Sequence, residues 1–83
     1  MQVYIGNLSS FTTAQQIARL FLPFGIVRTS RIVREESSGR SLGFGFVEME
    51  ESGARRAIRK LNQCLFMNSY VEVAVVNSFP GAA

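Results

Sequence analysis

The chain has 83 residues, of which 47% are apolar and 18% are charged, and its formal net charge is +3. These values predict one globular domain and exclude a disordered chain or a second core. No apolar run approaches the ~20 residues that a membrane helix requires, so we expect no membrane partner. Histidine is absent, which removes the commonest general base and metal ligand. We therefore expect no enzyme, no metal, no cofactor and no small-molecule substrate.

The single cysteine, Cys64, cannot form an internal disulfide, and the N-terminus lacks a basic segment followed by an apolar run. Both features fit a reducing compartment, so we expect a cytoplasmic protein. All of the nine basic residues except Lys60 are arginines. An arginine fork can grip a phosphate with two bonds or stack on a base, which suits an anionic partner.

The first half of the chain predicts a strand, a helix and a second strand. Residues 2–8 are rich in β-formers and indicate the strand. Thr12-Thr13 provide N-caps, with glutamines three residues later, and apolar residues from Ala14 to Phe21 keep helical spacing. Residues 26–34 predict the second strand. Its alternation is imperfect, which indicates a bulge near Arg28-Thr29.

The second half repeats the pattern in a different order. Residues 35–41 form a polar connection that is long for a hairpin and hence mobile. Residues 43–49 predict a third strand, and apolar residues between Glu51 and Leu61 again keep helical spacing. Asn68-Ser69 is a turn signal, and Val71 to Asn77 predict the last strand.

The element order is therefore βαββαβ. Two right-handed crossovers place both helices on one face of the sheet, which gives a ferredoxin-like α+β sandwich. We expect a four-stranded antiparallel sheet in the order 4-1-3-2. The domain comprises residues 1–77, and residues 78–83 form a short C-terminal tail. Such a sheet has one face covered by helices and one bare face.

Aliphatic and aromatic residues alternate along the first and third predicted strands. The aliphatic residues should pack on the helices, so Tyr4, Phe44 and Phe46 should lie together on the bare face. A large apolar side chain left exposed forgoes about 1.5–3 kcal/mol of burial free energy. A base stacked on such a ring contributes about 1–3 kcal/mol. The rings predict a stacking surface for nucleobases; the alternative is a second core covered by a partner or by the tail.

Two segments resemble the signatures of the RNA recognition motif family. Leu42 to Met49 is similar to the family's octamer, basic-Gly-aromatic-Gly/Ala-aromatic-aliphatic-any-aromatic. Val3 to Leu8 resembles its hexamer, aliphatic-aromatic-aliphatic-any-Asn-Leu. The resemblance covers roughly residues 2–77 and extends to the stand-alone single-motif proteins of bacteria, the cyanobacterial type included. It implies the fold inferred above and a function in binding single-stranded RNA.

The resemblance also implies roles for individual residues. Tyr4 would stack one base and Phe46 the next base toward the 3′ side, while Phe44 would contact the sugars between them. Val76 and Asn77, at the end of the last strand, would hydrogen-bond base edges. The implied biological role is post-transcriptional regulation or RNA chaperoning. Single-stranded DNA could bind the same face more weakly, because stacking does not require a 2′-hydroxyl.

The octamer departs from the family pattern at its charged position. Leu42 stands where the family has Arg or Lys, and this removes a contact worth about 1.5–3 kcal/mol when formed. Arg40, two residues earlier, is a candidate to replace that cation. Arg31, on the bare face of the second strand, is the phosphate contact that we favour. We expect an affinity in the micromolar range or weaker, with modest dependence on salt.

The glycines and glutamates of the motif strands carry further expectations. A side chain at Gly45 should crowd the helix packing beneath the sheet. Glu48 and Glu72 should share the bare face, where they would repel phosphate. The first strand would separate these carboxylates by about 9–10 Å, which is wide for a retaining carboxylate pair.

The sequence leaves three further questions: the role of the basic helix face, a rival function and the oligomeric state. The basic residues between Arg55 and Lys60 predict a solvated helix face on the back of the sandwich. The rival function is a protein-binding module of the same fold. Peptide-binding variants of the family tend to lose the sheet aromatics and carry an Arg-x-Phe before the last strand, and residues 65–68 lack that arginine. We expect a monomer, with Leu22, Leu42 and Phe79 as exposed apolar candidates for a self-contact.

Overall fold

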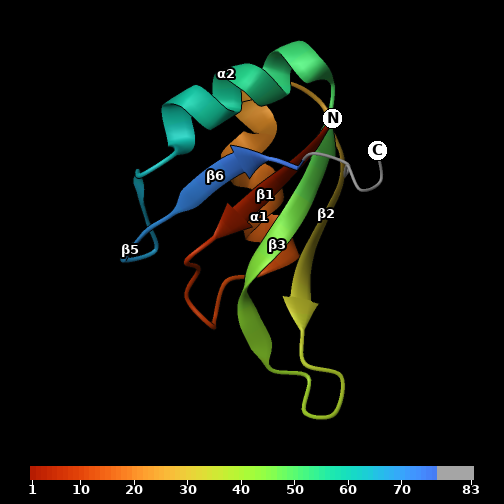
Figure 1. The fold of residues 1–83 in the computed structure, drawn as a ribbon, viewed down its shortest axis with the longest axis vertical. Coiled ribbons are helices and arrows are strands. Elements are labelled where there is room, and N and C mark those ends of the chain that lie inside the picture. Colours follow the sequence, from red (N-terminus) through yellow and green to blue (C-terminus); the bar gives the residue numbers. More distant parts are fainter. Residues whose placement is uncertain (77–83) are drawn as a thin grey trace.

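The structure is a computed structural model and describes residues 1–76 of the chain. Four of its strands form an antiparallel sheet in the order β2-β3-β1-β6 (Figure 1). With β6 as the fourth strand of this sheet, the predicted order 4-1-3-2 is confirmed. In chain order the elements are β1 (Gln2–Gly6), α1 (Ala14–Phe21), the 3-10 helix η1 (Leu22–Phe24), β2 (Val27–Arg34), β3 (Ser41–Met49), α2 (Glu51–Leu61), β4 (Leu65–Phe66), β5 (Ser69–Tyr70) and β6 (Glu72–Val75).

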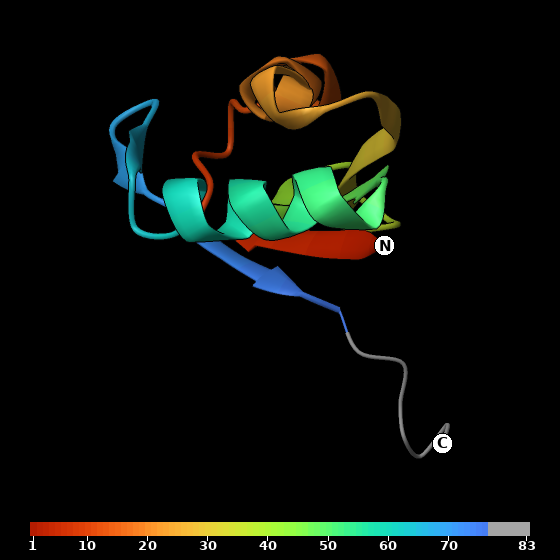
Figure 2. The ribbon, with the colours of Figure 1, turned by 90° about the horizontal axis from the view of Figure 1, so that it is seen from above.

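Both helices lie on the same side of the sheet, and the other face of the sheet is left uncovered by helices (Figure 2). The core lies between these two layers, where burying apolar surface drives folding. The aliphatic residues expected to face inward do so, which confirms the alternation argument. The buried side chains include Val3, Ile5, Ile17, Phe21, Val47, Ala54, Ala57, Val71 and Val73.

The start of α1 is fixed by the predicted capping box. The Gln16 backbone N–H donates to Thr13 Oγ1 at 3.1 Å, and the Thr13 backbone N–H donates to Gln16 Oε1 at 2.9 Å. These two bonds satisfy donors that have no partner within the helix. The chain then continues as the 3-10 helix η1, which contains Pro23. The Gly25 N–H donates to Leu22 O at 3.1 Å and closes this turn. The helix therefore ends where the sequence indicates.

The basic residues of α2 are all exposed, as the sequence predicts, but one of them also makes a contact with another element. Arg56 Nη2 donates to the carbonyl of Phe24 at 2.9 Å and so joins α2 to η1. Arg55 pairs with Glu51 one turn earlier, with 2.7 Å between Nη2 and Oε2. An exposed pair of this kind contributes little to stability. Arg56 therefore has a structural contact, whereas Arg59 and Lys60 extend into solvent.

A carboxylate caps the N-terminus of α2, and this gives a pH-dependent contribution to stability. Glu50 Oε1 accepts from Ser52 Oγ at 2.6 Å and from the Gly53 N–H at 3.3 Å. The Ser52 hydroxyl, followed by the backbone N–H groups of Ser52 and Gly53, lowers the pKa of Glu50. The folded state then binds its proton less tightly than the unfolded state does. The stabilisation is complete above the ordinary pKa of a glutamate and is lost as pH falls through the lowered value.

We therefore predict that Glu50→Gln lowers the thermal midpoint at neutral pH and that its deficit relative to the natural chain shrinks at acid pH. Thermal unfolding followed by circular dichroism between neutral and acid pH measures this difference. Glu36→Gln, which makes the same charge change in the connection between β2 and β3, serves as the control. A deficit that stays constant across the acid range would contradict the assigned role of Glu50.

A short hairpin precedes β6 and was not expected from the sequence. β4 and β5 pair antiparallel, with Leu65 opposite Tyr70 and Phe66 opposite Ser69. The two turn residues, Met67 and Asn68, both have positive φ, at 50° and 66°. Positive φ at both central residues is the conformation of a two-residue hairpin turn of type I′. The predicted turn signal at Asn68-Ser69 therefore lies one residue late, and β6 begins after it, at Glu72.

Two irregularities in the pairing of β2 with β3 shape the uncovered face. The first lies between Val27 and Thr29, which confirms the predicted bulge near Arg28. The second lies where Ile32 pairs with Gly45 while Arg34 pairs with Ser41, so β3 contains additional residues there. Gly43 lies within that stretch with φ of 83°, a conformation that favours glycine. The β3 segment before Phe44 is therefore bent away from a regular strand.

Candidate nucleic-acid interface

One row of paired residues crosses the whole sheet on its uncovered face. Arg31 of β2 lies opposite Phe46 of β3, Phe46 lies opposite Tyr4 of β1, and Tyr4 lies opposite Ala74 of β6. Residues directly opposite one another on neighbouring strands are close enough for their side chains to touch. The register therefore places a cation, two aromatic rings and a small residue in one line across the strands.

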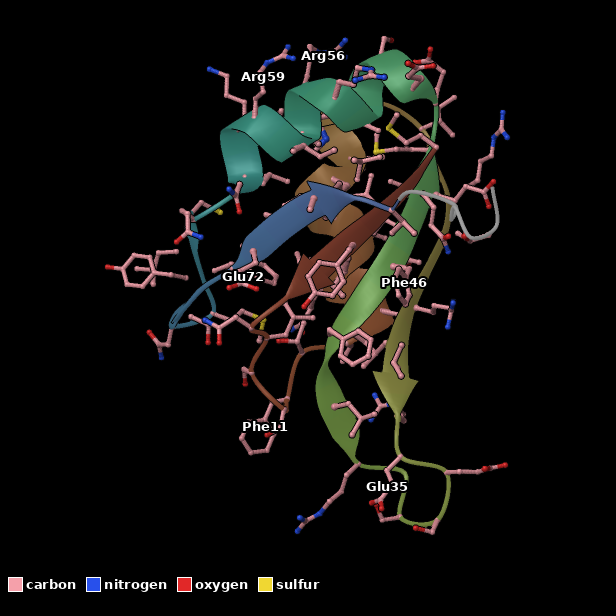
Figure 3. All side chains as sticks on the ribbon, in the orientation of Figure 1. Phe11, Glu35, Phe46, Arg56, Arg59 and Glu72 are labelled. Atoms are coloured by element: carbon pink, nitrogen blue, oxygen red, sulfur yellow. The ribbon has the colours of Figure 1, made fainter. Side chains whose placement is uncertain are left out.

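Phe44 joins the two rings of this row to form the aromatic cluster, which consists of Tyr4, Phe44 and Phe46. The ring centroids lie 5.9 Å apart for Tyr4 and Phe44, and 6.0 Å apart for Phe44 and Phe46. Tyr4 and Phe46 are separated by 6.2 Å. All three side chains are half-buried, and Figure 3 shows Phe46 in front of the sheet, on the face away from the helices. The predicted grouping of these residues is confirmed.

The ring of Tyr4 lies along the sheet, over Gly6. A β-carbon at Gly6 would overlap the Tyr4 hydroxyl and would lie 2.5 Å from Cζ of the ring. Gly6 is two residues after Tyr4 and so shares its face of the strand. The missing side chain at Gly6 thus provides the space in which the Tyr4 ring lies flat. A flat ring presents its face outward, which is the geometry that stacking requires.

Arg31 covers part of the aromatic cluster. Its guanidinium carbon lies 4.8 Å from the centroid of the Phe46 ring. A cation over an aromatic face at an exposed site gains about 0.5–1 kcal/mol. The structure thus brings Arg31 to the bare face as predicted and holds its charge beside the rings.

A side chain at position 45 is excluded by a different neighbour from the one expected. A β-carbon there would overlap the carbonyl oxygen of Arg31 and lie 3.2 Å from Cα of Ile32. Both atoms belong to the backbone of β2, so the predicted clash with the helices is wrong. The close approach of β2 to β3 next to the bulged region produces this contact. Gly45 therefore fixes the position of the strand that carries Arg31.

The residues expected at the end of the last strand are only partly described. The Val76 N–H donates to Gln2 O at 3.0 Å, so Val76 lies beside the start of β1. Gln2 in turn lies opposite Glu48 on β3. Asn77 and Phe79 lie outside the described residues.

Arg40 does not lie with the aromatic cluster. It lines a hollow at the end of the sheet together with Arg34 and Phe11. Neither Arg34 nor Phe11 was predicted from the sequence as a site residue. The three residues come from segments that are far apart in the chain, and no spacing pattern relates them. Arg40 therefore lines this hollow, whereas Arg31 lies over the Phe46 ring.

The two glutamates share the face with the aromatic cluster but are farther apart than expected. Glu48 lies opposite Gln2, whereas Glu72 lies opposite Gly6. Four residues along β1 and two strand spacings separate them by about 16 Å. The predicted separation of 9–10 Å is wrong, because the two glutamates are also offset along β1. The greater separation still gives no carboxylate pair.

Three further findings concern the described residues alone. No group of three or more His, Cys, Asp or Glu side chains within residues 1–76 is arranged to hold a metal ion. No helix in that part of the chain has the length and apolar character to cross a membrane. Cys64 is half-buried and forms no disulfide.

The fold and the aromatic cluster together define a class of protein, the ferredoxin-like domains that expose aromatic rings on the open face of their sheet. The family model described as the RNA recognition motif matches residues 3–72. The chain belongs to the RNA recognition motif family.

Sequence and structural similarity to individual proteins supports this assignment. The putative RNA-binding protein RbpE of Nostoc sp. is 36% identical over 74 residues, which cover 88% of this chain and 75% of that protein. The structure of RNA Binding Protein PG1 has a TM-score of 0.91 at 36% identity, covering 96% of this chain and 98% of that one. A structure described as the Sxl-lethal protein/RNA complex has a TM-score of 0.83 at 26% identity, covering 90% and 47%.

Proposed function

We propose that this chain binds single-stranded RNA on the uncovered face of its sheet. The observation that carries the proposal is the row of Arg31, Phe46 and Tyr4, with Phe44 beside it, on the face that no helix covers. Nucleobases are flat and stack on aromatic rings, and the neighbouring guanidinium suits a phosphate. The proteins and structures compared above are named for RNA binding, which supports the same function for this chain.

In this proposal each residue of the uncovered face contacts a different part of the RNA. Tyr4 stacks one base, Phe46 stacks the next base toward the 3′ side, and Phe44 contacts the sugars between them. Arg31 leaves the Phe46 ring and pairs with a phosphate. The end of β6, with Val76 and then Asn77, hydrogen-bonds base edges. With few phosphate contacts, the affinity of the domain is micromolar or weaker, and single-stranded DNA binds more weakly than RNA.

The proposal describes a binding module and assigns no catalytic step to any residue. We further propose that the chain acts as a cytoplasmic monomer in post-transcriptional regulation or RNA chaperoning. Two of the apolar residues considered for a self-contact, Leu22 and Leu42, are 61% and 53% exposed. The protein-binding alternative is less well supported, because peptide-binding variants of this fold tend to lose the sheet aromatics, whereas this chain keeps all three rings on the bare face.

Chemical-shift mapping by NMR tests the proposal. We expect titration of an isotope-labelled chain with short RNA oligomers to shift the signals of Tyr4, Phe44, Phe46 and their neighbours on β1 and β3. The matching DNA oligomers should shift the same signals at higher concentration. Shifts confined to α1 and α2 would contradict binding on the sheet. The absence of any RNA-dependent shift would contradict RNA binding itself.

A further inference from the structure

Another hollow, of about 200 Å³, lies between α2 and the end of β6, and we call it the α2–β6 hollow. Its lining residues are Met1, Arg55, Ile58, Arg59 and Val75. We propose that it holds one aliphatic side chain of an acidic segment of a partner protein, and that carboxylates beside this side chain pair with the two arginines. None of the lining residues belongs to the aromatic cluster, so the inference goes beyond the proposed function and does not depend on it.

The floor of the α2–β6 hollow is apolar. Val75 lies opposite Val3 on β1, whose side chain is buried, so Val75 is on the helix side of the sheet. It is nevertheless 42% exposed. Met1 and Ile58 are half-buried and pack against the core. Three apolar side chains therefore meet at a corner of the molecule that α2 does not cover completely.

Backbone hydrogen bonds hold this floor in place. The Met1 backbone nitrogen donates to Met49 O at 2.8 Å, and the Met49 N–H donates to Met1 O at 3.0 Å. The N–H of Val76, the residue after Val75, donates to Gln2 O at 3.0 Å. A side chain that enters the hollow meets groups that are already ordered, so binding costs this chain little conformational freedom.

The rim of the α2–β6 hollow is cationic. Arg55 and Arg59 are four residues apart on α2 and therefore lie on the same side of the helix. Arg55 is paired with Glu51, with 2.7 Å between Nη2 and Oε2. Arg59 forms no ion pair with any carboxylate in the part of the chain that the structure describes. The guanidinium of Arg59 is therefore available to a carboxylate of a partner.

The charge of the chain is concentrated on the helix that forms this rim. α2 has a net charge of +3, because it contains one acidic residue, Glu51, and four basic residues, Arg55, Arg56, Arg59 and Lys60. The whole chain also has a net charge of +3, so the remaining residues are neutral in sum. Figure 3 shows Arg56 and Arg59 on α2, well away from Phe46 on the sheet. The excess of cations therefore lies apart from the aromatic cluster, where it attracts an acidic partner.

The lining of the α2–β6 hollow favours a peptide over a nucleotide. None of the five lining residues has an aromatic ring on which a base could stack, and none has a side-chain oxygen that could accept from the amino group of a base. A base in the hollow would bury polar groups without partners, which is unfavourable. A leucine side chain has no polar group, and a hollow of about 200 Å³ admits one side chain of this kind. Carboxylates next to that leucine match the guanidinium groups of the rim.

NMR titration of the isotope-labelled natural chain with a synthetic peptide tests the proposal. The probe peptide contains one leucine with two glutamates on each side. We expect the signals of the five lining residues to shift and those of the aromatic cluster to stay in place. A peptide with serine in place of leucine should bind at least tenfold more weakly, because the burial of the leucine is lost. A peptide with glutamines in place of the glutamates should bind more weakly and with less dependence on salt.

Substitutions in the chain separate the apolar contact from the charged one. In Val75→Ser, the difference in affinity between the leucine and serine peptides should disappear. In Arg59→Gln, that difference should remain, while the affinity for the leucine peptide falls severalfold and depends less on salt. Ile26→Ser replaces an apolar side chain that is 81% exposed outside the hollow, and Arg19→Gln removes a charge from α1. Neither control should change peptide binding, and thermal unfolding checks that each variant is folded.

Three results would overturn the assignment of the α2–β6 hollow. The first is the absence of peptide binding, and the second is equal binding of the leucine and serine peptides by the natural chain. The third is a shift of the hollow's signals by a short uridine oligomer, which would show that the hollow binds RNA instead. Shifts of the aromatic cluster by the same oligomer report RNA binding on the sheet, so failure of the hollow is distinguishable from failure of the proposed function.

Discussion

Replacing Phe46 by alanine should weaken RNA binding by about 10- to 100-fold, because it removes one base-stacking surface worth about 1–3 kcal/mol. Phe46 lies between the other ring of the central row and its cation. It lies opposite both Tyr4 and Arg31, and its ring also meets Phe44 edge-on. Fluorescence anisotropy with a short single-stranded RNA measures the loss, and thermal unfolding of each variant checks that the domain remains folded.

Matched substitutions separate stacking from other causes. Phe46→Tyr keeps the flat ring and should retain most of the affinity. Phe46→Leu keeps an apolar side chain without an aromatic face and should lose nearly as much as Phe46→Ala. Arg59→Ala removes a positive charge from α2 and should leave binding nearly intact. It is a better control than Arg56→Ala, since Arg56 holds the carbonyl of Phe24. Equal losses in Phe46→Ala and Arg59→Ala would show that the helix side had been misjudged.

Two glycines of the motif strands should respond to alanine in opposite ways. Gly45→Ala should destabilise the fold by about 1–3 kcal/mol, because its β-carbon overlaps the backbone of β2, which can move aside only by opening the pairing with β3. For a domain of this size the thermal midpoint should fall by roughly 5–20 °C. Thermal and chemical unfolding of the purified variant measure both values.

Gly6→Ala is the counterpart, with little cost in stability and a large cost in affinity. The three atoms nearest to its β-carbon all belong to the far end of the Tyr4 side chain, which can swing away into solvent. The Tyr4 ring would then no longer lie flat, and we expect RNA affinity to fall roughly tenfold. If Gly6→Ala unfolds the domain, or if Gly45→Ala leaves its midpoint unchanged, the contacts assigned to these glycines are wrong.

Strand alternation and helical spacing were sufficient to predict the layers of the fold and the aromatic cluster. Tyr4 alternates with Val3 and Ile5, and Phe46 precedes Val47, so the aliphatic residues that must face the core place these two rings on the other face. Phe44 lies two residues before Phe46 on the same strand and so shares its face. The bulge near Arg28 was equally visible, because the alternation of β2 fails there. These features depend on neighbours within one element, which is the range over which a sequence pattern carries information.

The features that were missed depend on register or on segments far apart in the chain. β4 and β5 have two residues each, too few to show alternation, and their turn uses Met67 and Asn68 without a glycine. The distance between Glu48 and Glu72 depends on the registers in which β3 and β6 pair with β1. The hollow that contains Phe11 and Arg34 joins two loops, and the contact of Arg56 with Phe24 joins a helix to the chain before β2. No periodicity encodes such contacts.

The guanidinium over Phe46 means that the aromatic surface of the unliganded domain is already occupied in part by a group of the protein itself. A base that stacks on Phe46 must displace the Arg31 guanidinium from the ring. The net free energy of stacking is therefore smaller, because the cation–π contact is lost. The displaced charge becomes available to a phosphate at the same moment. Phe46 thus exchanges the guanidinium for a base, while Arg31 exchanges the ring for a phosphate. A free base without a phosphate should therefore bind this surface with less favourable free energy than a base within an RNA strand.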